Sequence, residues 1–66
     1  MNCTVNGDAM TFDRSMKLDE LLVELTMDSR PCAVEVNREL VPHASHQDHQ
    51  LAEGDIIEIV TLVGGG

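Results

Sequence analysis

Hydrophobic and polar residues alternate at the start of the chain, as in a β-strand with one buried face. Gly7 and Asp8 interrupt the alternation with residue types that suit a tight turn. Five apolar residues occupy every second position on either side of this turn: Met1, Cys3, Val5, Met10 and Phe12. Residues 1–12 are therefore predicted to form a β-hairpin with one apolar face.

A different spacing of apolar residues begins at Leu18. Four leucines follow the i, i+3, i+4, i+7 pattern of one helical stripe: Leu18, Leu21, Leu22 and Leu25. Asp19 and Glu20 lie in the first turn, where the helix dipole favours a carboxylate. Pro31 prevents the helix from continuing into the next segment. We therefore predict one amphipathic helix after the hairpin.

The second half of the chain contains three further short apolar segments. Residues 32–36 alternate like a strand, residues 37–38 suit a turn, and residues 40–41 form a short return strand before a proline. After a turn at 53–55, residues 56–60 are apolar at nearly every position, which is typical of a central strand. The order of elements predicts an α+β fold, with a mixed sheet of four or five strands packed on one helix.

Length and charge narrow the class of function. A chain of 66 residues is expected to form a single domain over residues 1–66, too small to enclose a substrate site, so we expect a carrier or binding module rather than an enzyme. Twelve acidic residues against four basic ones give a formal charge of −8. This charge disfavours nucleic acid and anionic membranes as partners and favours brief docking onto basic protein surfaces.

The cysteine content and the absence of targeting patterns indicate a cytoplasmic protein. Cys3 and Cys32 are too few and too widely spaced for a disulfide framework or a metal clip, so we interpret them as reduced core thiols. No secretory signal follows Met1, and no segment approaches the ~20 apolar residues of a membrane span.

Several segments resemble one family, the small ubiquitin-like sulfur carriers of bacteria, and within it the sulfur carriers of thiamine biosynthesis. The resemblance covers the whole chain. It is carried by Asp19–Leu22, Val34–Pro42, the turn Glu53–Asp55 and the glycine tail Val63–Gly66. Arg38 departs from the family pattern, in which a glycine often follows the asparagine.

The resemblance implies a β-grasp (ubiquitin-like) fold and a role as co-substrate. In the family, an adenylating enzyme uses ATP to activate the C-terminal carboxylate, here that of Gly66, and sulfur replaces one oxygen to give a thiocarboxylate. The thiocarboxylate then supplies sulfur to thiazole synthase, and the sulfur comes from a donor such as a cysteine desulfurase. No permanently bound cofactor is implied. The family fold would also place Cys3 and Cys32 two strand spacings apart, ~9.6 Å, too far for a disulfide.

The end of the chain has the composition of a flexible tail, which we expect at about residues 62–66. Glycine lacks a Cβ, so Gly64, Gly65 and Gly66 suit a narrow channel in a partner enzyme. If Ile57 and Ile59 face the helix, the neighbouring apolar residues face the other way. We therefore predict that partner enzymes bind an apolar patch and recognise the glycines that follow it. The patch consists of Ile56, Val60, Leu62 and Val63. Packing within the fold is the alternative role of these side chains.

Three histidines recur at every third position, which would place them on one side of a short 3₁₀ turn beside Asp48: His43, His46 and His49. Such a cluster is a candidate for a transition-metal site. We prefer a solvated polar loop, because metal ligands need a rigid surrounding shell and this segment is irregular in sequence. No metal is therefore expected.

Other functions remain open on the sequence. The small subunit of molybdopterin synthase has the same fold and tail, but Thr61–Val63 lacks the proline that usually precedes its glycines. A ubiquitin-like protein modifier and a non-covalent β-grasp interaction subunit are further alternatives.

Overall fold

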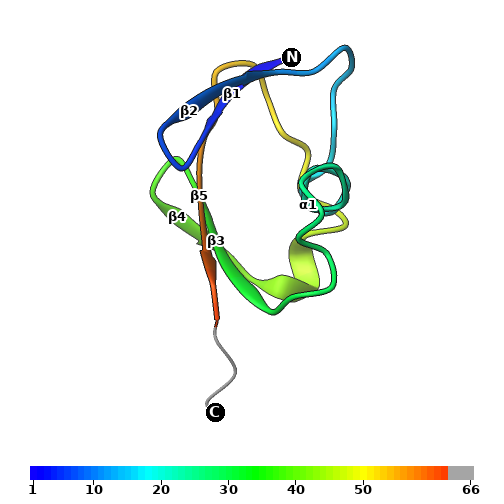
Figure 1. Cartoon of the computed structure of the whole chain (residues 1–66), viewed down its shortest axis with the longest axis vertical. Helices are drawn as coiled ribbons and strands as arrows, with labels where there is room; N and C mark the ends of the chain where they lie inside the picture. Colours follow the sequence, from blue (N-terminus) through cyan, green and yellow to red (C-terminus); the bar gives the residue numbers. More distant parts are fainter. Residues whose placement is uncertain (63–66) are drawn as a thin grey trace.

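The computed structural model describes residues 1–62, and Figure 1 shows a sheet on one side with a helix packed against it. The helix α1 spans Leu18–Glu24 and a 3₁₀ turn, η1, spans His43–Ser45. The strands are β1 (Asn2–Val5), β2 (Asp8–Thr11), β3 (Cys32–Val36), β4 (Glu39–Val41) and β5 (Ile56–Thr61). No helix in residues 1–62 has the length and apolar character needed to cross a bilayer.

The last strand lies at the centre of the sheet, as its sequence predicts. The order of strands is β2-β1-β5-β3-β4. β5 runs parallel to β1 and antiparallel to β3, while β2 and β4 complete antiparallel hairpins at the two edges. The sheet is therefore mixed and has five strands in the described part of the chain, which confirms the expected architecture.

The helix covers one face of the sheet and closes the core. Leu18, Leu21 and Leu22 are buried, and Leu25 is partly buried, so the predicted leucine stripe is confirmed. Within residues 1–62, twelve residues form the core: Cys3, Val5, Met16, Leu18, Leu21, Leu22, Val34, Val36, Val41, Leu51, Ile57 and Ile59. Burial alternates along β5, and its two buried side chains, Ile57 and Ile59, face α1.

The start of α1 is held from two sides. The Lys17 backbone N–H donates to Oε1 of Glu20 at 2.9 Å, and this bond, together with the Arg14 guanidinium, lowers the pKa of Glu20. The next two N–H groups of the helix donate to carbonyl oxygens of the loop 43–50, Leu18 to His49 and Asp19 to His46. The loop thus satisfies helix N–H groups that would otherwise lack a partner.

Both hairpins turn through backbone angles in the left-handed region. In the first, Asn6 and Gly7 have φ of 50° and 86°, so the turn lies one residue earlier than predicted and Asp8 already belongs to β2. In the second, Asn37 and Arg38 have φ of 53° and 71°. Left-handed angles at both central residues are those of the type I′ hairpin turn, which favours glycine at the second position.

Replacing Arg38 by glycine is expected to stabilise the protein by about 1 kcal/mol. A left-handed conformation costs a non-glycine residue ~1–2 kcal/mol, and the greater entropy of glycine in the unfolded chain offsets part of the gain. The measurement is urea denaturation of the Arg38→Gly variant against the parent. Arg38→Ala is the matched control, because alanine removes the guanidinium but keeps the Cβ that causes the strain. Equal gains in both variants would assign the effect to the lost charge instead.

Candidate functional site

Most of the large apolar side chains that are exposed in the described part of the chain lie on the face of the sheet that points away from α1. Ile56 and Val60 of β5 are 52% and 60% exposed, Leu40 of β4 is 64% exposed, and Leu62 just after β5 is 51% exposed. With the exposed Glu35 and Glu58, these residues make up what we call the outer sheet face. Their exposure agrees with the predicted direction of Ile56, Val60 and Leu62.

Leu40 is a member of this face that the sequence analysis did not identify. Leu40 and Val41 form a short apolar pair in the sequence, but alternation in β4 buries Val41 and turns Leu40 outward. The alternation over residues 39–41 is the sequence signal for this orientation. Three residues are too few to tell which side of a strand is buried unless the neighbouring strand is known. The register of the sheet settles it, because Leu40 lies opposite Glu35 and Val41 opposite the buried Val34.

A shallow hollow indents the outer sheet face at the start of β5. Its volume is about 520 Å³ and it is lined by Asn37, Arg38, Ile56 and Glu58. We call it the outer hollow. Its walls combine one aliphatic side chain with one carboxylate and one guanidinium, so it suits an amphipathic side chain from a partner.

Polar contacts fix the start of β5 against the β3–β4 hairpin. The Asn37 side-chain oxygen accepts from the Ile56 N–H at 3.0 Å, and its Nδ2 donates to Oδ1 of Asp55 at 3.0 Å. Asp55 is buried and its other oxygen accepts from the Ala52 N–H at 2.8 Å. Both oxygens of Asp55 are thus engaged, as a buried carboxylate requires. Ile56 is thereby held at the rim of the outer hollow.

Three further hydrogen bonds hold the far part of β5 and the residue that follows it. β1 ends at Val5, and the Asn6 side chain takes over the pairing: its Oδ1 accepts from the Ile59 N–H at 2.7 Å and its Nδ2 donates to the Ile59 carbonyl at 3.1 Å. The Leu62 N–H donates to the Pro31 carbonyl at 2.9 Å. The described chain ends here. The predicted site residues Val63, Gly64, Gly65 and Gly66 lie outside the described residues, so their roles stay predictions.

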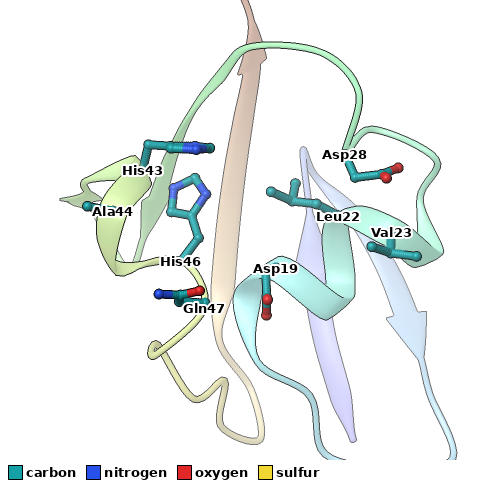
Figure 2. Close-up of a pocket in the computed structure, with 8 residues that line it drawn as sticks. All are labelled: Asp19, Leu22, Val23, Asp28, His43, Ala44, His46 and Gln47. Atoms are coloured by element: carbon teal, nitrogen blue, oxygen red, sulfur yellow. The ribbon is translucent and has the colours of Figure 1, made fainter.

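The opposite side of the molecule has a groove of about 310 Å³ between α1 and η1, drawn in Figure 2. One wall carries the imidazoles of His43 and His46, whose ring centroids are 5.2 Å apart in an edge-to-face arrangement. The other wall carries side chains from α1 and the loop after it: Asp19, Leu22, Val23 and Asp28. We call this the helix-side groove.

His46 is the exception to the predicted solvation of residues 43–50, in which six of the other residues are exposed and His49 is half-buried. The His46 side chain is only 4% exposed, and its Nε2 lies 3.0 Å from the Val41 carbonyl oxygen. Since a carbonyl only accepts, Nε2 carries a proton and donates. The 3₁₀ turn η1 covers His43–Ser45, so it does not bring His43, His46 and His49 onto one side of a single turn. Within residues 1–62 no group of three or more histidine, cysteine or acidic side chains is arranged to hold a metal ion.

The two cysteines are free thiols in the structure. Burial, followed by the nearby Asp55 charge, raises the pKa of Cys3, which disfavours the reactive thiolate. The predicted separation of ~9.6 Å between Cys3 and Cys32 is wrong, because two strand spacings give only the distance across the sheet and leave out the distance along the strands. Thr4 lies beside Ile56 and Cys32 beside Thr61, so the cysteines are also displaced along β5 by roughly 20 Å. The conclusion that they form no disulfide is unaffected.

Known proteins match this chain over most or all of its length. The model of the ThiS family matches residues 3–66. A sulfur carrier protein ThiS of Bacillus subtilis is 33% identical over 49 residues, which are 74% of this chain and 74% of that protein. A thiazole synthase of Paramagnetospirillum magneticum is 44% identical over 66 residues. The match covers the whole of this chain but only 20% of that much longer protein.

A solved structure agrees in fold. The crystal structure of a thiamine biosynthesis protein (ThiS) from Geobacter metallireducens superposes with a TM-score of 0.85 at 33% identity, and each chain is covered completely. This likeness confirms the expected β-grasp fold, with its mixed sheet packed on one helix.

Proposed function

The chain belongs to the ThiS family of sulfur carriers in thiamine biosynthesis, and on this premise we propose that the carboxylate of Gly66 is the group that carries the sulfur. The observation that supports this most directly is the extent of the family match, which runs through the glycines to residue 66. The chain acts as a carrier, and the catalytic groups belong to its partners.

The proposed chemistry occurs in two steps at one carbonyl carbon. An oxygen of the Gly66 carboxylate attacks the α-phosphorus of ATP on the adenylating enzyme, which releases pyrophosphate and leaves a mixed anhydride with AMP. A sulfide equivalent from the donor then attacks the carbonyl carbon and expels AMP, which gives the thiocarboxylate. Activation is needed because a free carboxylate has no good leaving group. ATP is consumed by the partner, so the carrier needs no resident cofactor.

The outer sheet face supports a docking role for the domain. Ile56 and Val60 lie on β5, the strand that leads directly to Leu62 and the tail. A partner that binds this face therefore holds the strand from which the glycines depart. Exposed apolar surface of this kind is characteristic of interaction sites. We propose that the partners seat the domain through Ile56, Val60, Leu62 and Val63, and read Gly64 and Gly65 in a narrow channel.

Thiazole synthase is the proposed acceptor of the sulfur. The thiazole synthase of P. magneticum is about five times longer than this chain and contains a segment that matches the whole of it. In that protein, a domain similar to this chain and the named thiazole synthase share one polypeptide. The adenylating enzyme and a sulfur donor such as a cysteine desulfurase are the further proposed partners.

The proposal is tested by intact-mass measurement. The full chain is incubated with the adenylating enzyme of the same organism, ATP and sodium sulfide. The expected result is a mass gain equal to the replacement of one oxygen by sulfur, located at Gly66 by fragmentation. A variant lacking Gly66 is expected to show no gain. An equal mass gain in that variant would contradict the proposal, because the sulfur would then be carried by a group other than the carboxylate of Gly66.

A further inference from the structure

We propose that Glu35 and Glu58 together form a docking site for one basic side chain, an arginine or lysine, on the enzyme that activates Gly66. This inference rests on the proposed function and adds to it the charge of the partner at a defined place on the outer sheet face.

The two glutamates are direct cross-strand partners. Glu35 of β3 is paired with Glu58 of β5, and both side chains are exposed on the same face. Side chains opposed in this way have Cβ atoms about 4.5–5.5 Å apart, and like charges there destabilise a sheet. The ion pair found in residues 1–62 joins Arg14 to Glu20 at 3.2 Å, and none there involves Glu35 or Glu58. The repulsion is therefore not relieved by a salt bridge within the described chain.

Apolar side chains frame the pair. Ile56 and Val60 lie two residues before and after Glu58 on β5, and Leu40 lies opposite Glu35 on β4. A partner that covers these aliphatic groups also removes water from the carboxylates between them. Desolvating two carboxylates without a compensating charge is costly, so a partner that binds this face must supply a cation.

The outer hollow gives that cation a route. It lies beside Glu58 and is walled by Ile56, so an aliphatic stem can pack on Ile56 while its charged head reaches the carboxylates. An arginine suits two acceptors best, because its planar guanidinium donates to two oxygens at once.

Arg38 also lines the outer hollow and carries the opposite charge. It makes no ion pair within 4.0 Å in residues 1–62, so it leaves Glu58 unpaired. The three groups together keep a net charge of −1, since two carboxylates face one guanidinium. If the partner supplies a cation, Arg38 opposes binding. If the partner supplied a carboxylate, Arg38 would be the residue it needs.

The test is ATP–pyrophosphate exchange by the adenylating enzyme, measured against the concentration of the carrier. Glu35→Gln/Glu58→Gln is expected to raise the KM for the carrier about tenfold at low salt with little change in kcat, because docking is weakened and the tail is intact. The salt dependence of KM should also be shallower than for the parent. A denaturation midpoint equal to or above that of the parent shows that the variant is folded.

The matched control is Glu24→Gln/Asp28→Asn. It changes the net charge by the same amount at two exposed positions, at the end of α1 and in the loop after it. This control is expected to change KM less than about twofold. The charges of Glu24 and Asp28 lie away from the proposed docking site, so they attract the enzyme only over a long distance, where salt screens the attraction. An equal rise in the control would overturn the proposal in favour of general charge attraction.

Three other outcomes are decisive. An unchanged KM in the double glutamine variant, with exchange by the parent intact, overturns the docking site and leaves the proposed function standing. A higher KM in Arg38→Gln, with no change in Glu35→Gln/Glu58→Gln, would show that the enzyme places an acidic group against Arg38. This result would also overturn the docking site for a basic side chain. Absence of exchange with the parent chain contradicts the proposed function itself, and the docking site falls with it.

Discussion

Replacing Ile57 by alanine is expected to remove about 3–4 kcal/mol of folding free energy, most of what a domain of this size has. Ile57 has no exposed surface and lies in the central strand, where it packs between the sheet and α1. Truncation removes buried methyl groups and leaves a cavity that rigid neighbours on both sides cannot close. Urea denaturation followed by circular dichroism should show a substantially unfolded protein even at low denaturant.

The neighbouring residue provides the matched control. Ile56→Ala removes the same atoms one position earlier in β5, but its side chain is 52% exposed and points to the outer sheet face. It should change the free energy of unfolding by no more than about 0.5 kcal/mol. A comparable loss in Ile56→Ala would mean that the outer sheet face is buried in solution, for example against a second copy of the chain.

Replacing Gly65 by alanine is expected to reduce the rate of thiocarboxylate formation at least about 100-fold. The proposed channel of the adenylating enzyme must bring the Gly66 carboxylate to the α-phosphate of ATP, and a misplacement of about 1 Å can cost a factor of this size. Glycine at this position allows close approach of backbone to enzyme, and a Cβ obstructs it. The rate is measured by intact mass over time at saturating ATP.

Two comparisons separate this effect from damage to the fold. The thermal unfolding of Gly65→Ala should match that of the parent, since the substitution lies beyond the end of β5 at Thr61. Gly64→Ala should lose less activity, because it is one residue farther from the reacting carbonyl. Sulfuration of Gly65→Ala at the parental rate would show that only the carboxylate matters and that the glycine requirement is wrong.

The elements of secondary structure were largely predictable because their signals are local. The alternation in residues 1–12, the leucine stripe from Leu18 and the apolar run at 56–60 each reflect a period set by backbone geometry. They correctly identified the first hairpin, the helix and the central strand. The resemblance to sulfur carriers added the β-grasp topology, which no local pattern specifies.

Contacts between distant segments were beyond the reach of these patterns. His46 lies in a polar segment and was expected to be solvated, but its burial depends on the Val41 carbonyl and on the helix packed beside it. The separation of Cys3 from Cys32 depends on the registers of β1 and β3 against β5. A shift in register changes such distances without changing the sequence pattern of any strand.

The candidate site divides in the same way. The sequence by itself determined that Ile56 and Val60 lie in an apolar run followed by glycines, and that they face away from the core if Ile57 and Ile59 face it, because composition and the period of a strand are properties of the chain alone. Only the tertiary structure decided that Leu40 joins them, that Glu35 faces Glu58, and that a hollow opens beside Arg38. The reason is physical: a side chain's neighbours across a sheet are set by strand pairing, and β1 and β5 pair although they stand at opposite ends of the chain.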